Sequence, residues 1–275
     1  MYIEKAIEYC EIARKFAKEG KYEESVSFYN RAIEIDKSIL PAYVECAWSL
    51  QDLHENEKAI DYLNMAHDID PSNAKIYFFM GHSYDGLELD SKAVECYDKA
   101  IELDPEYYEA YYNKAFCLYL LGRYEEAIDN LNMARDIDPS NAKIYFFMGH
   151  SYDRLELDSK AVECYDKAIE LDPEYYEAHY NKARCLYLLG RYEEANDILS
   201  KAISINPNDH EAYQNKGMIL KKLEKFDEAI MFLDKALELN PENKKAFNNK
   251  KGISFERRGK MKKAEEYYNK ARKYP

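Results

Sequence analysis

Histidine, serine and aspartate occur together in one short run of the sequence, Gly81-His82-Ser83-Tyr84-Asp85, and these are the residue types of a nucleophilic relay. The surrounding pattern is helical, and successive helical side chains diverge by about 100°, so the three cannot form a hydrogen-bonded relay. His82 and Asp85 share one helix face, yet one imidazole and one carboxylate are half of a metal site. No phosphate-binding loop or dinucleotide fingerprint occurs either. We therefore expect no enzymatic activity, no metal and no cofactor.

The other reactive residue types have structural explanations. Glu125 and Glu126, like Glu193 and Glu194, open a predicted helix, where exposed backbone amides favour negative charge. The cysteines form no CxxC pair and fall on helical patterns, which predicts small reduced side chains rather than a disulfide framework. They are Cys10, Cys46, Cys96, Cys117, Cys164 and Cys185. Reduced cysteines fit a cytoplasmic protein.

Prolines divide the chain at a fixed interval of 34 residues. They stand at Pro71, Pro105, Pro139, Pro173, Pro207, Pro241 and Pro275. Aligned on this interval, the sequence forms eight repeats, the first of which carries Lys37 in place of the proline. The repeats span approximately residues 6–39, 40–73, 74–107, 108–141, 142–175, 176–209, 210–243 and 244–275. A fixed period of this length indicates a stack of similar structural units.

Each repeat carries the pattern of two helices joined by a tight turn. Gly20, Gly122 and Gly190 fall where the first helix must stop, and Asp-Pro or Asn-Pro ends the second helix. Small residues recur at the eighth and twentieth places of the repeat, where they let the helices approach closely. They are Gly81, Ala115, Gly149, Ala183 and Gly217 at the eighth place, and Ala59, Ala93, Ala127, Ala161, Ala195 and Ala229 at the twentieth. We expect these positions to be structural.

This pattern resembles the tetratricopeptide repeat. The third repeat shows the signature in Tyr77, Met80-Gly81, Tyr84, Ala93, Tyr97, Ala100 and Pro105. The resemblance implies an all-α fold, a right-handed superhelical α-solenoid of tandem helix-turn-helix repeats, in a single domain over residues 1–275. The eighth repeat departs from the pattern, because one extra residue precedes Gly252. Its polar last helix is expected to cap the stack.

Stacked repeats of this kind form a concave surface lined by their first helices. Places 2, 5, 9 and 12 of each first helix form the stripe expected to face this groove, and they are rich in aromatic residues flanked by charges. Place 6 adds a ladder of asparagines, which can pair with the backbone of an extended peptide, as the family does. The candidate binding residues are Phe78, His82, Tyr112, Asn113, Phe116, Tyr119, Phe146, His150, Arg154, Tyr180, Asn181, Arg184, Tyr187, Asn215 and Asn249. The alternative is that these rings pack against neighbouring repeats and the asparagines are solvated.

The predicted function is a non-enzymatic scaffold or adaptor that binds a partner protein or peptide in this groove. Places 5 and 9 lack the lysine and asparagine with which some tetratricopeptide proteins hold a chaperone's terminal carboxylate, so a chaperone-tail adaptor is disfavoured. Two alternatives stay open, a self-assembling structural solenoid and a regulatory or targeting subunit of a separate enzyme. We expect a monomer or a weak homo-oligomer.

Charge and hydropathy argue against other partners. The net charge of −13 disfavours an extended nucleic-acid surface, although the residues from Lys244 onward include 12 basic and 3 acidic side chains. No apolar run reaches the roughly 18 residues that a membrane helix requires. The first residues also lack the pattern of a signal peptide. We therefore expect a cytoplasmic protein with no nucleic-acid and no membrane partner.

One block of two repeats is duplicated almost unchanged. Residues 59–127 and 127–195 differ at five of their 69 aligned positions. The differences are Tyr62/Asn130, His67/Arg135, Gly86/Arg154, Tyr111/His179 and Phe116/Arg184. Three of the five place an arginine in the second copy.

Overall fold

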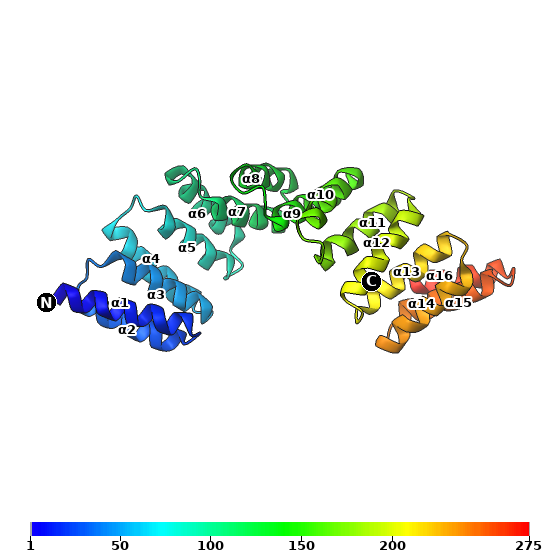
Figure 1. The fold of residues 1–275 in the computed structure, drawn as a ribbon, viewed down its shortest axis with the longest axis horizontal. Helices are drawn as coiled ribbons and strands as arrows, with labels where there is room; N and C mark the ends of the chain where they lie inside the picture. The colour runs from blue at the N-terminus through cyan, green and yellow to red at the C-terminus, as the bar shows by residue number, and fades with distance from the viewer. Residues whose placement is uncertain (1, 275) are drawn as a thin grey trace. The chain divides into compact units, whose positions relative to one another are not determined.

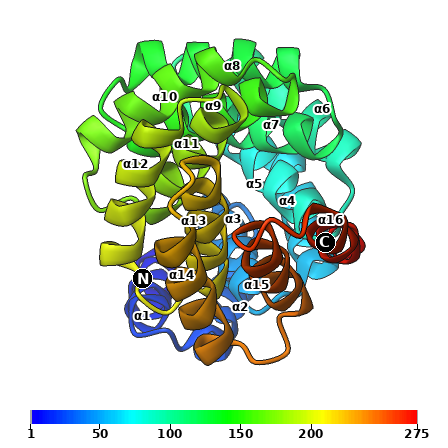
Figure 2. The ribbon, with the colours of Figure 1, turned by 90° about the vertical axis from the view of Figure 1, so that its right-hand side faces the viewer.

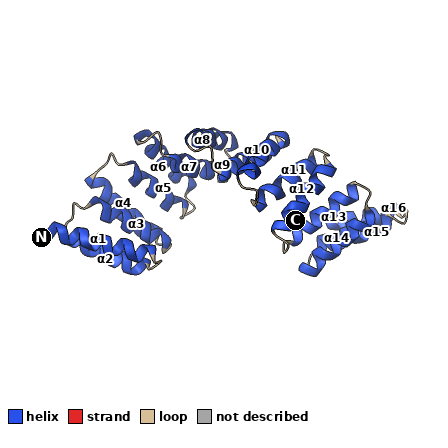
Figure 3. Cartoon of the chain, viewed as in Figure 1, coloured by secondary structure: helices blue, strands red, loops and turns tan. Residues whose placement is uncertain are grey.

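The computed structural model describes residues 2–274, which form sixteen α-helices and no β-strand (Figures 1 and 3). Met1 and Pro275 lie outside the described residues, so the last proline of the 34-residue series is not tested. The chain divides into two compact units, unit 1 (Met1–Pro139) and unit 2 (Ser140–Pro275). The expected all-α fold of tandem helix pairs is confirmed, and the single domain over residues 1–275 stays a prediction.

Unit 1 contains the first four repeats, each of which is one pair of helices. The pairs are α1 (Tyr2–Lys18) with α2 (Tyr22–Ile35), α3 (Leu40–Asp52) with α4 (Asn56–Ile69), α5 (Ala74–Asp85) with α6 (Asp90–Leu103), and α7 (Tyr108–Leu120) with α8 (Tyr124–Ile137). The two helices of a pair pack side by side, and α2, α4 and α6 also pack on α3, α5 and α7, the first helices of the next repeats. Neighbouring repeats of this unit are therefore packed together.

Unit 2 repeats this arrangement (Figure 2). Its pairs are α9 (Ala142–Arg154) with α10 (Asp158–Leu171), α11 (Tyr176–Leu188) with α12 (Tyr192–Ile205), α13 (His210–Lys222) with α14 (Phe226–Leu239), and α15 (Lys244–Glu256) with α16 (Met261–Ala271). Acidic residues open α8 and α12 in their first turns, as predicted. These helix bounds agree with the predicted repeats.

A residue in the left-handed backbone conformation lies in the turn between the two helices of every repeat. In four repeats it is a glycine with φ from 70° to 76°, namely Gly20, Gly122, Gly190 and Gly259, which confirms the three predicted glycines. In the other four it carries a side chain and has φ of 58° or 59°, namely His54, Glu88, Glu156 and Glu224. This conformation costs a residue with a side chain about 1–2 kcal/mol. Packing of the helix pair therefore imposes the turn even where glycine is missing.

Small residues set the distance between the two helices of a pair. The alanines at the twentieth place are completely buried. Gly81 lies so close to the ring of Tyr97 that a Cβ atom there would be 2.7 Å from Cε1 of the ring. Gly149 packs on Tyr165 in the same way, since a Cβ atom there would be 2.8 Å from Cε1 of that ring. These contacts confirm the structural role predicted for both sets of positions.

The eighth repeat accommodates its extra residue without breaking the helix. α15 runs continuously over 13 residues, and Gly252 lies beside Tyr268 as Gly217 lies beside Leu233. α16 has 11 residues where α14 has 14, and its buried residues are Ala264 and Ala271. Most of the other residues of α16 are polar and exposed, as expected of a terminal capping helix.

Two further expectations concern cysteines and membrane spans. All six cysteines are free thiols. None of the helices in residues 2–274 combines the length and apolar composition that crossing a bilayer requires.

Candidate protein-binding site

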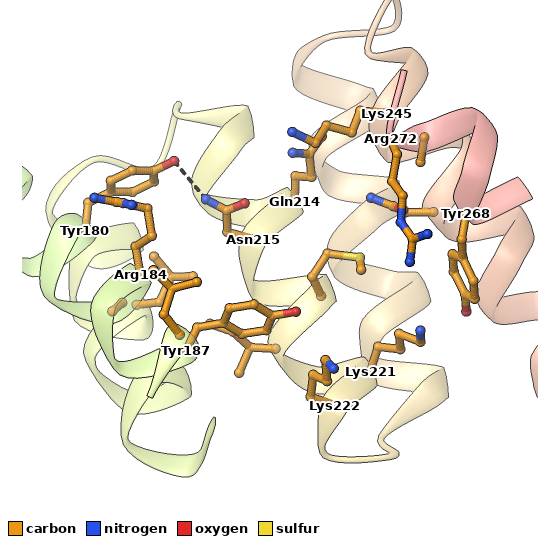
Figure 4. Close-up of a pocket in the computed structure, with 17 residues that line it drawn as sticks. Tyr180, Arg184, Tyr187, Gln214, Asn215, Lys221, Lys222, Lys245, Tyr268 and Arg272 are labelled. Atoms are coloured by element: carbon orange, nitrogen blue, oxygen red, sulfur yellow. Dashed lines mark hydrogen bonds between the residues drawn. The ribbon is translucent and has the colours of Figure 1, made fainter. Parts of the chain in front are cut away.

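Unit 2 contains a pocket of about 470 Å³ beside the first helices of its last three repeats (Figure 4). One wall comes from α11, the base from α13, and the opposite wall from α15 and the end of α16. The lining residues are Tyr180, Ala183, Arg184, Tyr187, Leu188, Leu199, Gln214, Asn215, Met218, Ile219, Lys221, Lys222, Lys245, Asn249, Tyr268, Ala271 and Arg272. The pocket thus combines aromatic, amide and cationic side chains.

The pocket is basic although the chain as a whole is acidic. Its cations are Arg184, Lys221, Lys222, Lys245 and Arg272, and no aspartate or glutamate lines it. Arg184 pairs with Asp153, and Lys221 lies 3.4 Å from a carboxylate oxygen of Glu256. The other three cations make no ion pair within 4.0 Å among residues 2–274. Their charge is therefore available to an anionic ligand.

Amide and phenol groups lie between these cations. Asn215 donates its side-chain amide to the hydroxyl of Tyr180 at 2.8 Å, the dashed line in Figure 4. Burial raises the pKa of Tyr180 to about 12, so this phenol is neutral at physiological pH. The side-chain oxygen of Gln214 is buried and has no hydrogen-bond partner among the described residues.

Polar contacts at the helix starts fix the position of the pocket helices. Asp209 caps α13, because its carboxylate accepts from the backbone amides of Glu211 at 2.7 Å and Ala212 at 3.4 Å. The same carboxylate accepts from the hydroxyl of Tyr176 in α11. At the next junction, the side chain of Asn243 caps α15 and also contacts the ring of His210 at 3.2 Å. Each cap therefore ties one repeat to its neighbour.

Five of the candidate residues predicted in unit 2 lie together in the pocket. They are Tyr180, Arg184, Tyr187, Asn215 and Asn249, from three successive repeats. The periodic stripe and the asparagine ladder therefore identified residues that the fold brings to one cavity. Whether they bind a partner stays a prediction.

Of the other four candidates of unit 2, Asn181, Phe146 and His150 contact residues of their own repeats. Asn181 donates its amide to the backbone carbonyl of Glu177 at 2.9 Å. The ring of Phe146 is buried and packs on Tyr175, with ring centroids 4.9 Å apart. His150 stacks on Phe146, and burial lowers the pKa of its imidazole. Arg154 is the exposed last residue of α9.

The six candidates of unit 1 lie on α5 and α7. Phe78 packs on Tyr107 with ring centroids 4.8 Å apart, and His82 on the same helix is exposed. On α7, Tyr112 contacts Tyr108 and Tyr119 contacts Tyr124, while Asn113 and Phe116 are half-buried. These ring contacts agree with the alternative that the aromatic side chains pack against neighbouring elements. A role of these six residues in binding a partner stays a prediction.

Sequence reasoning missed several residues of the pocket. Lys221 and Lys222 stand at the end of α13, beyond the places assigned to the groove stripe, and Arg272 follows α16. For Arg272 the signal available was the excess of basic residues from Lys244 onward, whereas no sequence signal marked Lys221 and Lys222. Part of that basic end also lines a cavity.

Family models match most of the chain. Models for the tetratricopeptide repeat match residues 9–39, 74–107, 96–129, 142–175, 159–216 and 210–243, and a model for the TPR repeat matches residues 117–155. A sequence search of the curated proteins found no match.

Solved structures share the fold. YrrB, described as a TPR protein with an unusual peptide-binding site, is 25% identical, with a TM-score of 0.62 over 69% of this chain and 97% of its own. The C-terminal part of a TPR repeat-containing protein from Cytophaga hutchinsonii is 19% identical, with a TM-score of 0.72 over 86% of this chain and 98% of its own. MamA is 22% identical, with a TM-score of 0.56 over 62% and 93%. With the matched repeats and the paired helices, these likenesses show that the chain belongs to the tetratricopeptide repeat family.

Proposed function

We propose that this chain is a non-enzymatic scaffold that binds a partner polypeptide, and that the pocket of unit 2 takes an acidic segment of that partner. The observation that carries this proposal is the concentration of five cations, without one carboxylate, in a pocket of a chain whose net charge is −13. Carboxylate side chains are the complementary groups that a polypeptide offers.

The neutral residues of the pocket suit the remainder of a peptide. Tyr187 and Met218 present apolar surface for side chains between the acidic residues. Asn215, which is half-buried, carries an amide that can pair with a peptide backbone whatever its sequence. The expected ligand is therefore an extended segment in which Asp or Glu alternates with apolar residues.

The family relationship supports a binding role. Tetratricopeptide repeat proteins are in general scaffolds for protein or peptide partners, and YrrB has a peptide-binding site by its description.

We further propose that Tyr112, Asn113, Phe116 and Tyr119 of α7 form a separate contact surface in unit 1. The free cysteines suit a reducing compartment, and we propose the cytoplasm.

Fluorescence anisotropy with labelled peptides tests the proposed function. The probe is a twelve-residue peptide in which glutamate alternates with leucine or phenylalanine, and its partner probe carries glutamine at each glutamate position. We expect the acidic probe to bind more tightly and to lose affinity as salt is added, because its carboxylates meet Lys222, Lys245 and Arg272.

Charge reversal in the pocket gives the decisive comparison. A close interfacial charge pair is worth about 1.5 kcal/mol or more, so Lys222→Glu, Lys245→Glu and Arg272→Glu should each weaken binding by roughly tenfold or more. Lys160→Glu is the matched control, because Lys160 is an exposed residue of α10 in unit 2, outside both the pocket and the groove stripe. Equal affinity for both probes, or equal losses in Lys160→Glu and the pocket variants, would contradict the proposal.

A further inference from the structure

A thiol and two carboxylates converge in the third and fourth repeats, in unit 1, and none of the three lines the pocket of unit 2. Asp85 is the last residue of α5, Asp90 is the first of α6, and Cys117 lies on α7. One ligand atom from each of the three lies within 4.8 Å of the other two. The Cys117 thiol is completely buried and donates to a carboxylate oxygen of Asp85 at 3.6 Å. The repeat junction thus places three metal-ligating side chains together.

The negative charge of this cluster is not neutralised by protein cations. Asp85 and Asp90 make no ion pair within 4.0 Å among the described residues. Two neighbouring, partly buried carboxylates favour the arrival of a positive charge.

A buried polar group beside the cluster also lacks a partner. The hydroxyl of Tyr97 is completely buried and makes no hydrogen bond among residues 2–274. The ring of Tyr97 lies against Gly81, which is one turn before Asp85 on the same face of α5, so Tyr97 lies beside the face of α5 that carries the cluster. The tyrosine at the same place of the first repeat, Tyr29, donates to a carboxylate at 2.9 Å. Leaving such a group without a partner costs about 1–3 kcal/mol, which a bound water or ligand would relieve.

The duplicated block provides an internal comparison. Its second copy holds the equivalent cluster of Asp153, Asp158 and Cys185, with the thiol 3.5 Å from a carboxylate oxygen of Asp153. There Arg184 pairs with Asp153, whereas the first copy has the uncharged Phe116 at that position. Arg154 adds a second cation next to Asp153 where the first copy has Gly86. In the second copy the protein itself supplies the cation that the first copy lacks.

We propose that Asp85, Asp90 and Cys117 bind a thiophilic divalent cation of the Zn²⁺ class. Zn²⁺ binds thiolate sulfur at about 2.3 Å and carboxylate oxygen at about 2.0–2.2 Å, so two of its tetrahedral ligands lie roughly 3.3–3.8 Å apart. The sulfur-to-oxygen distance of 3.6 Å between Cys117 and Asp85 already falls in this range. Three protein ligands leave one position for a water molecule, which can serve as the missing partner of the Tyr97 hydroxyl. On binding, the Cys117 thiol loses its proton to solvent and its sulfur bonds to the metal.

Titration of the full chain with Cd²⁺, followed by its thiolate-to-metal charge-transfer absorption, tests this site. We expect one equivalent of Cd²⁺ per chain to produce the band, with release of a proton. Cys117→Ser should abolish the band, while Cys185→Ser, the same substitution in the second copy, should retain it. Asp90→Asn should weaken Zn²⁺ binding in calorimetry by at least about tenfold, because it removes a charged ligand. Far-ultraviolet circular dichroism checks that each variant keeps its helices.

A gain of binding gives the sharper test. Arg154→Gly combined with Arg184→Phe gives the second copy the residues of the first, and we expect this double variant to bind a second equivalent of Cd²⁺. The proposal is overturned if the wild-type chain shows no band, if the band survives Cys117→Ser, or if Cys185→Ser removes it. A double variant that still binds one equivalent would equally overturn it. The two arginines would then not be the reason why the second copy binds no metal.

Discussion

The contact between Gly149 and Tyr165 predicts how much one methyl group costs in this fold. In Gly149→Ala the new Cβ would lie 2.8 Å from Cε1 and 2.9 Å from Cδ1 of the ring, closer than packed carbons approach. Tyr165 is completely buried, so its ring has no free space into which to move. The helices α9 and α10 must therefore separate, or the ring must leave its preferred position.

The expected magnitude is a difference of two terms. Alanine is favoured over glycine in a helix interior by about 1 kcal/mol, and overpacking a filled core costs roughly 1–3 kcal/mol. We expect Gly149→Ala to lower the free energy of unfolding by up to about 2 kcal/mol. In the next repeat the places of Gly149 and Tyr165 hold Ala183 and Leu199, so alanine occurs there opposite a smaller side chain than tyrosine. Adding Tyr165→Leu should therefore recover stability, with a coupling free energy of at least about 1 kcal/mol.

Urea unfolding of the wild type, both single variants and the double variant measures this coupling, and hydrogen exchange localises it to α9 and α10. Ala183→Gly serves as the opposite control. It should destabilise by about 1 kcal/mol, because it removes a helix-favouring methyl group where there is room for one. A coupling below roughly 0.5 kcal/mol in the cycle would refute the argument that the ring requires glycine.

Three other predictions concern single side chains. Burial lowers the pKa of His150, so the fold favours its neutral form. The stability that this contributes should be complete above about pH 6.5 and fall as the pH drops below it, and His150→Gln should reduce this slope in thermal melts. Asp209→Ala removes the cap of α13 and should cost about 1–2 kcal/mol in urea unfolding. Gln51 is buried and donates to Ser83 in the next repeat at 2.7 Å, so Gln51→Leu should cost about 1–3 kcal/mol and increase hydrogen exchange in α5.

The repeats were predictable because each one is specified by local features. The 34-residue proline interval, the helical periodicity and the alanines at the twentieth place all mark the same helix pairs, and the structure places helices there. The glycine turns illustrate the limit of such signals. Glu88 and Glu156 adopt the same left-handed turn as Gly122, because the packing of the helix pair selects the conformation. The residue type at these two positions does not predict that conformation.

The candidate site was predictable in part. Tyr180, Arg184 and Asn215 follow from helical spacing within single repeats, and the structure brings them into one pocket. Lys222 and Arg272 come from the ends of two helices in different repeats, and only the packing between repeats brings them together. Rings such as Phe78 were assigned to the groove stripe, but the inter-repeat turn covers one face of this ring with Tyr107, a contact that helical spacing within one repeat does not reveal.

The four left-handed turns that lack glycine imply an uneven resistance to opening along the chain. Each of them, at His54, Glu88, Glu156 and Glu224, carries a conformational cost that the glycine turns avoid. Because contacts in such a stack run between neighbours, that cost weakens mainly the repeat that bears it. The second, third, fifth and seventh repeats should therefore exchange their amide hydrogens sooner than their neighbours. The repeats would then open locally in a definite order. Substituting glycine at one of these four turns should slow the exchange of the repeat that carries it.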